Sequence, residues 1–320
     1  MNLDQLATRL EDKLAGSISR EVLLARLTTY RLGGPAALLV EPAGVDDLEE
    51  LGRALRDLDP GRTTEVLAVG RGSNLVVSDA GWAGIVVRVG SAFSWIDSWT
   101  GPGAPEGGVR TGAGTSLPQL ANWAARRGLA GLEWAVGVPG SVGGAVRMNA
   151  GAHGTETSDV LVEARVFDLT GAELVTRPAD TLALAYRHSN LDASDLVVEA
   201  FLALTRDEPS TIKERTESFR RHRAATQPGA AQNAGSVFTN PPGDSAGRLV
   251  EAAGLKGFRI GGASVSVLHA NFFMADDDAT AQDVFDLVAE VRARVRRRSG
   301  VDLVPEIRFV GSFASSSEVP

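Results

Sequence analysis

Residues 137–154 of this 320-residue chain read G-V-P-G-S-V-G-G-A-V-R-M-N-A-G-A-H-G. They end a glycine-rich region, because fourteen of the 36 glycines lie between Gly101 and Gly154, a density too high for ordinary strands and helices. Glycine allows positive φ angles and a close approach of backbone to a ligand, and Asn149 adds a hydrogen-bonding carboxamide. The segment predicts backbone wrapped around a planar cofactor and its pyrophosphate, with a run of tight turns as the alternative.

A second glycine-rich segment, V-G-R-G-S-N-L-V-V (69–77), places a turn between two apolar runs. Successive backbone N–H groups in such a turn can form a concave nest for phosphate oxygens. A Rossmann fingerprint would need a third glycine and an opening helix, and a P-loop would need Gly-Lys followed by Ser or Thr; neither is present. The turn residues are Gly70, Arg71, Gly72, Ser73 and Asn74.

The composition excludes several classes of chemistry. The chain has no cysteine, which rules out disulfides, thiolate nucleophiles, iron–sulfur clusters and cysteine zinc sites. Its four histidines have no ligand-like spacing, so we expect no metal. The net charge is −8, and the basic run over 292–300 is typical of a helix C-terminus, where cations interact favourably with the dipole. We therefore expect no nucleic-acid partner.

The N-terminal segment has Leu3, Leu6, Leu10 and Leu14 at helical spacing with charges between them. A secretory signal would need an uninterrupted apolar segment and a cleavage site. The sequence contains no apolar run of about 18 residues, so we expect no membrane span. These features predict a cytoplasmic protein with no membrane partner and no obligatory protein partner.

Alternating hydrophobic patterns predict a mixed α and β chain in four parts. The parts are an N-terminal helix (1–20), a large domain (21–205), a smaller domain (206–312) and a disordered tail (313–320). The predicted helices cover 45–58, 117–128, 209–227, 245–253 and 279–299. The predicted strands cover 36–42, 66–70, 84–89, a hairpin over 160–177 around Thr170-Gly171, 196–205, a strand-rich segment over 259–275, and 301–310.

The two glycine-rich segments together resemble the FAD-binding half of the UDP-N-acetylenolpyruvoylglucosamine reductase (MurB) family. They also resemble the wider vanillyl-alcohol-oxidase (PCMH) type of flavoprotein. T-T-Y-R-L-G-G-P-A (28–36) matches as well, with Leu27 where the family often has Asn. The resemblance implies an α+β fold, with a two-subdomain FAD-binding module over 21–205 and a smaller α/β substrate-binding domain over 206–312. The implied FAD-binding residues, acting mainly through backbone donors, are Gly70, Arg71, Gly72, Ser73, Asn74, Pro139, Gly140, Ser141, Gly143, Gly144, Ala145, Asn149 and Gly151.

The resemblance implies an oxidoreductase of peptidoglycan precursor synthesis. In the family, NADPH gives a hydride to FAD, and the reduced flavin gives it to the enolpyruvyl group on UDP-N-acetylglucosamine, which yields UDP-N-acetylmuramate. Hydride addition leaves an enolate-like charge beside the substrate carboxylate. The protein must therefore stabilise that charge and deliver one proton.

Three residues match the family's catalytic positions. The resemblance assigns the substrate carboxylate to Arg187, proton donation to Ser236, and stabilisation of the intermediate to Glu306. On local pattern alone, the alternatives are a surface ion pair for Arg187, a turn-capping Ser236 and an edge-strand Glu306. The motifs are A-Y-R-H-S-N (185–190), N-A-G-S-V-F-T-N-P (233–241) and L-V-P-E-I-R-F-V-G (303–311).

Other matched positions are implied to contact substrate: Tyr186, Asn240, Lys256, His269 and Asn271. Two residues depart from the family pattern. Thr239 stands where many relatives have lysine, and the alternatives are weaker substrate binding or a phosphate contact made instead by a residue such as Lys256 or Arg259. Ala275 replaces a common asparagine. The only tyrosines are Tyr30 and Tyr186, so the chain resembles the shorter, second form of the family, which lacks a tyrosine-bearing cap.

Two alternatives stay open. A flavin oxidase or dehydrogenase of the same fold, acting on a hydroxy acid or alcohol, would share the FAD segments without needing Arg187, Ser236 and Glu306. A catalytically silent flavin- or nucleotide-binding protein with a regulatory role is favoured only by Thr239 and Ala275.

Overall fold

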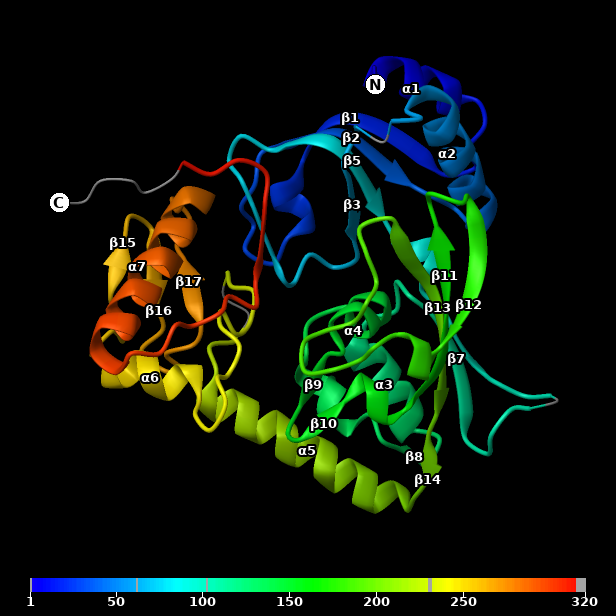
Figure 1. The fold of residues 1–320 in the computed structure, drawn as a ribbon. Coiled ribbons are helices and arrows are strands. Elements are labelled where there is room, and N and C mark those ends of the chain that lie inside the picture. The colour runs from blue at the N-terminus through cyan, green and yellow to red at the C-terminus, as the bar shows by residue number, and fades with distance from the viewer. Residues whose placement is uncertain (1, 62, 102, 230–231, 315–320) are drawn as a thin grey trace. The chain divides into compact units, whose positions relative to one another are not determined.

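The computed structural model describes residues 2–61, 63–101, 103–229 and 232–314 (Figure 1). Packing divides the chain into two compact units. Unit 1 comprises residues 1–20, 38–71 and 84–222, and unit 2 comprises residues 21–37, 72–83 and 223–320. Each unit has a hydrophobic core of its own. The contiguous division predicted between residues 205 and 206 stays a prediction.

The centre of unit 1 is a five-stranded antiparallel sheet of order β12-β11-β13-β7-β6. Its middle strand, β13, is buried continuously from Asp195 to Ala200. Helix α4 packs on this strand and also contacts β7 (Figure 1). The predicted hairpin around Thr170-Gly171 is confirmed as β11 and β12. The strands are β6 (Ile96–Ser98), β7 (Gly108–Gly112), β11 (Leu161–Asp168), β12 (Glu173–Pro178) and β13 (Asp195–Ala203).

A second sheet has the order β1-β2-β5-β3, with β3 and β5 parallel. Its strands confirm the strand predictions over 36–42, 66–70 and 84–89. They are β1 (Ser17–Leu23), β2 (Pro35–Glu41), β3 (Val66–Val69) and β5 (Trp82–Arg88). Short strands and 3₁₀ helices complete the first 206 residues: β8 (Leu129–Ala130), β9 (Gly151–Ala152), β10 (Thr155–Glu156), β14 (Thr205–Arg206), η1 (Leu24–Leu27), η2 (Ser91–Phe93), η3 (Glu133–Gly137), η4 (Thr157–Asp159) and η5 (Ala179–Thr181).

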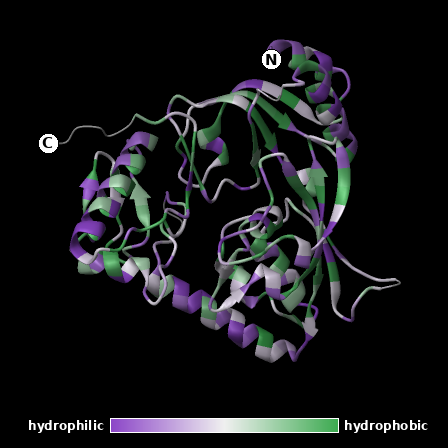
Figure 2. Ribbon diagram, in the orientation of Figure 1, coloured by the Kyte–Doolittle hydropathy of each residue, from purple (hydrophilic) through white to green (hydrophobic). Residues whose placement is uncertain are grey.

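The helices of the first two-thirds of the chain begin at side-chain caps or at glycine and proline. They are α1 (Leu3–Glu11), α2 (Val45–Leu58), α3 (Leu117–Ala125), α4 (Val142–Met148) and α5 (Pro209–Thr226). Helix α2 has the bounds that the spacing predicts, whereas α1 ends at Glu11, before Leu14. Helix α5 is largely hydrophilic (Figure 2) and buries only Ile212 and Thr216, so core packing contributes little to it.

Unit 2 packs its core between two helices and a small antiparallel sheet of order β15-β16-β17. Helix α7 begins with a capping box between Thr280 and Asp283 and ends at Gly300, whose φ of 74° favours glycine. A parallel pair, β4 and β18, joins residues far apart in sequence. The elements are β4 (Leu75–Val77), α6 (Ala246–Ala252), β15 (Arg259–Ile260), β16 (Ala263–Val265), β17 (Phe273–Ala275), α7 (Ala281–Ser299) and β18 (Arg308–Val310).

The strand predicted over 301–310 is wrong in its first part, because only Arg308–Val310 forms a strand. Pro305 has no backbone N–H to give to a ladder, and it pairs with Phe238 in an isolated bridge instead. Of the tail predicted to be disordered, Phe313 stacks on Phe285 at 4.9 Å and Ala314 donates its N–H to Gln282 at 3.0 Å. The remaining residues, 315–320, lie outside the described part of the chain.

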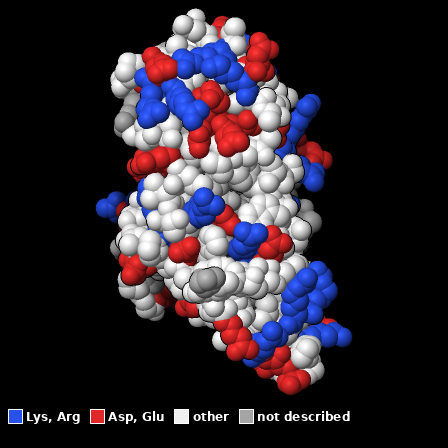
Figure 3. Space-filling model, turned by 90° about the vertical axis from the view of Figure 1, so that its right-hand side faces the viewer, with Lys and Arg blue, Asp and Glu red and all other residues white. Residues whose placement is uncertain are grey.

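The surface shown in Figure 3 carries acidic and basic side chains in mixed groups. Within the described residues, three arginines of α7 are paired: Arg292 with Asp302 at 2.7 Å, Arg294 with Glu290 at 2.6 Å and Arg297 with Glu290 at 3.6 Å. Among these residues, no helix has both the length and the apolar character needed to cross a membrane.

Candidate active site

The two glycine-rich segments meet in unit 1 at Gly70 and Ser141. A Cβ added to Gly70 would stand 2.3 Å from the Ser141 hydroxyl oxygen and 3.3 Å from its Cβ. Ser141 is buried and caps α4, accepting a hydrogen bond from the N–H of Gly144 at 3.4 Å. A side chain at position 70 would therefore have to displace the hydroxyl of Ser141 that caps α4.

Residues 137–154 contain a helix, α4, so the expectation that this region is too rich in glycine for an ordinary helix is wrong here. Ser141 supplies a normal N-cap and the residues after Gly144 favour helix, which outweighs the cost of two glycines. The N–H of Val142 donates to Thr115 at 2.9 Å and that of Gly143 donates to Ala113 at 2.9 Å. Backbone donors for a cofactor are thus limited in this segment, because the first three N–H groups of α4 bind within the protein.

Asn149 ends α4 in the left-handed conformation, with φ of 40°, and is fully buried. Its amide nitrogen donates to the carboxylate of Glu156 at 2.7 Å and to the carbonyl of Ala185 at 3.1 Å. Its amide oxygen accepts from the N–H of Ser158 at 2.9 Å. These three bonds use both ends of the carboxamide within unit 1, so the predicted flavin contact of Asn149 gains no support from its side chain.

Arg187 lies in a tight turn whose ends, Ala185 and His188, exchange backbone hydrogen bonds of 3.2 and 2.9 Å. Its φ is 56°, a left-handed conformation that a branched or long L-residue adopts at a cost of about 1–2 kcal/mol. The guanidinium donates to the carbonyl of Gly151 at 3.1 Å and lies over the ring of Tyr186, 4.8 Å from its centroid. Strain of this kind is characteristic of functional positions.

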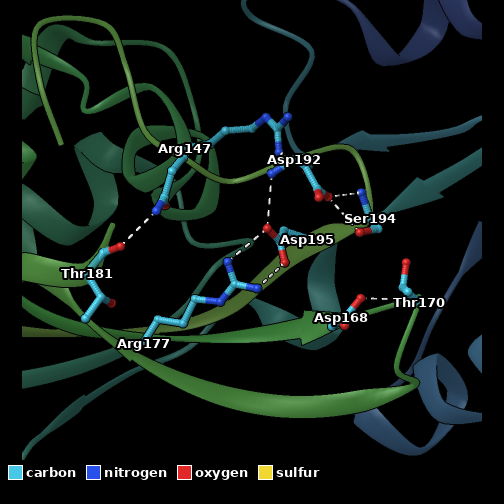
Figure 4. A network of polar contacts seen from close by, with 9 residues as sticks. Arg147, Asp168, Thr170, Arg177, Thr181, Asp192, Ser194 and Asp195 are labelled. Atoms are coloured by element: carbon cyan, nitrogen blue, oxygen red, sulfur yellow. Dashed lines mark hydrogen bonds and ion pairs between the residues drawn. The ribbon is translucent and has the colours of Figure 1, made fainter. Parts of the chain in front are cut away.

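The chain after this turn is held by a polar network (Figure 4). Ser189 donates its hydroxyl to the carbonyl of Arg147 at 2.6 Å, and Arg147 donates to the carbonyl of Asp192 at 2.7 Å. Asp195, which is only 5% exposed, accepts two bonds from Arg177, at 3.0 and 2.6 Å. Figure 4 shows Asp195 between Arg177 and the N–H of Asp192. The segment that bears Arg187 is therefore fixed at both ends.

In unit 2, the turn after β3 packs on the chain that precedes β2. A Cβ on Gly72, whose φ is 60°, would stand 1.9 Å from the carbonyl oxygen of Leu27. Asn74 donates its side-chain amide to the carbonyl of Glu306 at 3.0 Å, and its own carbonyl accepts from Arg308 at 2.9 Å. Gly72 and Asn74, two residues of the turn predicted to bind phosphate, are therefore engaged in contacts within the protein.

The structure brings together the backbone segments of Ser236 and Glu306. The N–H of Glu306 donates to the carbonyl of Val237, the residue after Ser236, at 2.7 Å. Ser236 pairs with Phe272 in an isolated bridge. Both residues are partly exposed. The two motifs, 70 residues apart in sequence, therefore lie side by side within unit 2.

Four of the predicted substrate residues lie in unit 2, and each makes a contact within the protein. Asn271 is buried, and its carboxamide makes two bonds with Phe238, one to the N–H at 2.9 Å and one to the carbonyl at 2.8 Å. His269 accepts from the N–H of Asn271 at 3.2 Å, and burial lowers the pKa of its imidazole. Lys256 pairs with Glu251 at 2.8 Å, and Asn240 accepts from Ala246 at 3.0 Å.

The residues that depart from the family pattern have local structural roles. Thr239 directs both its N–H and its hydroxyl to the carbonyl of Val304, at 2.9 and 3.3 Å. Ala275 is buried in β17 opposite Ala263. Arg259 is one of the two cations suggested to replace the family's lysine at position 239, and it pairs with Asp276. Tyr30 is fully buried, and burial raises the pKa of its phenol. Its hydroxyl donates to the carbonyl of Phe273 at 2.9 Å.

Sequence reasoning missed the partners of these residues. Glu156 and Ser158 bind Asn149, and Ser189 binds Arg147, but none of the three is in the predicted site. The one local signal is the capping-box pattern of Glu156 and Asp159. In the part of the chain that the structure describes, no cluster of three or more acidic or histidine side chains is arranged to hold a metal.

Comparison with known proteins defines the class first. The model of an FAD binding domain matches residues 36–177, and that of the C-terminal domain of UDP-N-acetylenolpyruvoylglucosamine reductase matches residues 227–310. The chain is therefore a flavoprotein with an FAD binding domain followed by a distinct C-terminal domain. The predicted fold class and the predicted FAD cofactor are confirmed.

Full-length relatives define the family. The UDP-N-acetylenolpyruvoylglucosamine reductase of Synechococcus sp. (strain WH7803) is 42% identical over 95% of this chain and 96% of its own length. That of Bacillus subtilis (strain 168) is 37% identical over 97% and 99%. The crystal structure of the reductase from Thermus caldophilus, 33% identical, superposes with a TM-score of 0.79 over 92% of this chain and 100% of that one. The chain belongs to the UDP-N-acetylenolpyruvoylglucosamine reductase family and is an oxidoreductase.

Proposed function

We propose that this protein reduces the enolpyruvyl group of UDP-N-acetylglucosamine enolpyruvate to give UDP-N-acetylmuramate, with NADPH as the hydride source. The observation that carries this proposal is a match of both family models and of relatives that span nearly the whole chain. A cytoplasmic location and the lack of an obligatory protein partner stay predictions.

The residues of unit 1 fit an FAD. Gly70 and Ser141 draw the two glycine-rich segments together, and a Cβ on Gly144 would meet only the Ser141 hydroxyl, at 3.5 Å. Backbone without side chains is therefore exposed beside the start of α4, as a planar group in close contact requires. When bound there, FAD supplies the hydride chemistry that none of the twenty side chains provides.

Three side chains are assigned to the substrate. Arg187 is permanently charged and suited to grip a carboxylate through two parallel hydrogen bonds. Ser236 donates a proton to the carbon next to the one that receives the hydride. A serine hydroxyl is a weak acid, so this step needs neighbouring charges or donors that stabilise the alkoxide. Glu306 assists in stabilising the charge that develops. The support for these roles is the matched motifs and the backbone contact that joins the segments of Ser236 and Glu306.

The test separates the two half-reactions. The protein is reduced with NADPH without oxygen while the flavin absorbance is followed, and enolpyruvyl-UDP-N-acetylglucosamine is then added. The proposal predicts bleaching followed by rapid reoxidation. Bleaching without reoxidation would contradict the substrate and favour an oxidase or dehydrogenase of the same fold. A protein that takes up FAD and shows neither step would favour the silent regulatory alternative.

A further inference from the structure

We infer that three asparagines, Asn149, Asn271 and Asn74, are positioning residues, one for each of the three proposed catalytic segments. Each lies within the same unit as the segment that it binds. The inference rests on the proposed function, because the residues that are positioned are those assigned to the substrate. It changes the roles that family resemblance gives these asparagines, which are flavin contacts for Asn74 and Asn149 and a substrate contact for Asn271.

Asn149 positions the turn of Arg187. Its amide nitrogen donates to Ala185, the first residue of that turn, and the bond lies in a fully buried setting. Gly151, two residues after Asn149, accepts directly from the guanidinium of Arg187 at 3.1 Å. Two points close together in sequence thus fix both the backbone and the side chain of Arg187. Because the φ of Arg187 is strained, the turn needs such external bonds to persist.

Asn271 positions the segment of Ser236. Its carboxamide bonds both the N–H and the carbonyl of Phe238, two residues after the serine. Its backbone carbonyl also accepts from the N–H of Val237 at 2.8 Å. Phe238 is itself buried, so this end of the segment is fixed by packing and by three hydrogen bonds. The backbone directly after Ser236 is therefore held in place.

Asn74 positions Glu306. It donates to the carbonyl of Glu306 itself, while the N–H of Glu306 donates to Val237. Both backbone groups of Glu306 are therefore engaged, on one side by the Asn74 amide and on the other by the segment of Ser236. The placement of Glu306 and that of Ser236 are coupled through this contact.

A carboxamide suits all three places because it is neutral and donates through its nitrogen to a carbonyl oxygen in each case. Aspartate has nearly the same shape, but an ionised carboxylate only accepts hydrogen bonds. It would face the Ala185, Phe238 or Glu306 carbonyl without a proton to share. The exchange of asparagine for aspartate therefore removes the positioning bond of Asn271 or Asn74 with little change in volume. At position 149 aspartate would also face the carboxylate of Glu156, which accepts from the Asn149 amide at 2.7 Å, so the result there is read together with that of Asn149→Gly.

The experiment compares Asn149→Asp, Asn271→Asp and Asn74→Asp with Asn122→Asp as a matched control. Asn122, on α3, also donates its amide to a backbone carbonyl, that of Pro118 at 2.7 Å, but has no contact with a proposed catalytic segment. Asn149→Gly, which keeps the left-handed backbone, is the second variant if the buried charge prevents folding. For each protein we would measure FAD affinity, substrate affinity, the rates of both half-reactions, and amide hydrogen exchange over residues 183–190, 234–240 and 302–308.

The inference predicts slower reoxidation by substrate, by about 10- to 100-fold, with FAD affinity and reduction by NADPH close to wild type. Hydrogen exchange should rise in the segment that the altered asparagine binds, and not in the control. Weakened FAD binding with unchanged hydrogen exchange would support direct flavin contacts by Asn74 and Asn149 and would overturn the inference. Unchanged exchange overturns it even if the wild-type protein proves to act on another substrate, since that measurement does not depend on turnover.

Discussion

Gly70 and Ser141 lie so close that an added Cβ on Gly70 would stand 2.3 Å from the Ser141 hydroxyl oxygen. We predict that Gly70→Ala forces this hydroxyl away from the N–H of Gly144 and uncaps α4. A lost cap costs about 0.5–2 kcal/mol, and loosening of the start of α4 should weaken FAD binding at the glycine backbone beside it. Flavin fluorescence during titration with FAD measures the affinity.

The control for this prediction is Gly44→Ala. Gly44 precedes α2, also in unit 1, and a Cβ there would meet no atom within 4 Å. The FAD affinity of Gly44→Ala should equal that of the wild type. Equal FAD affinity in Gly70→Ala would contradict the role of this contact in holding the cofactor.

Ser236→Ala is expected to stall only the second half-reaction. Reduction of the flavin by NADPH needs no proton from Ser236, so its rate should stay within about twofold of wild type. Reoxidation by substrate should fall by about 10²- to 10⁴-fold, the range for loss of a general acid. Stopped-flow absorbance without oxygen measures both rates. Equal losses in both steps would show that Ser236 acts in binding or folding rather than in proton transfer.

Arg187→Gly is expected to abolish substrate reduction without lowering stability. Glycine adopts the left-handed φ of position 187 freely and so relieves about 1 kcal/mol of backbone strain, which offsets the lost bond to Gly151. Arg187→Lys keeps the charge and the strain, but not the paired hydrogen bonds, and should mainly raise KM. Thermal denaturation measures the stability of the two variants, and steady-state kinetics measures their activity and KM. A clear fall in Tm for Arg187→Gly would mean that the arginine is kept for structure.

The sequence predicts elements with strong periodicity and misses those set by tertiary bonds. Helix α2 has its predicted bounds because its apolar positions, such as Leu48 and Leu51, repeat at helical spacing and are buried. The strand at 301–310 is shorter, because Pro305 pairs with Phe238, a partner that no local pattern reveals.

The same limit applies to the candidate site. The motifs of Ser236 and Glu306 can be found in the sequence, and the structure shows their backbones in contact. That Asn149, Asn271 and Asn74 bind backbone carbonyls within their own units could not be predicted, since a buried carboxamide and a ligand-binding one look alike in sequence.

Stability should depend on pH through Asp59, which follows α2. Its carboxylate accepts from the N–H of Thr63 at 3.0 Å, the hydroxyl of Thr63 at 2.8 Å and the N–H of Thr64 at 2.7 Å, and these bonds hold its pKa well below the ordinary value. A lowered folded-state pKa contributes stability above the unfolded value, about 3.9, and this is lost as the pH falls towards the folded value. Asp59→Asn should therefore be less stable at pH 7, by roughly 1–3 kcal/mol. The difference should shrink below about pH 4. Urea midpoints from pH 7 to pH 3 test this, and a constant difference would contradict it.

Arg177 and Asp195 form a bidentate pair in which the carboxylate is 5% exposed. Arg177→Met leaves that carboxylate buried without its cation. Loss of one partner of a buried pair costs about 3–5 kcal/mol, and the partial exposure of Arg177 places the expected loss near the lower end. Asp195 would still accept from the N–H of Asp192, so the chain after Arg187 should loosen rather than unfold. The double variant Arg177→Met with Asp195→Asn removes the unpaired charge and should recover most of the lost Tm. A double variant no more stable than Arg177→Met would show that the lost stability does not come from the unpaired charge of Asp195.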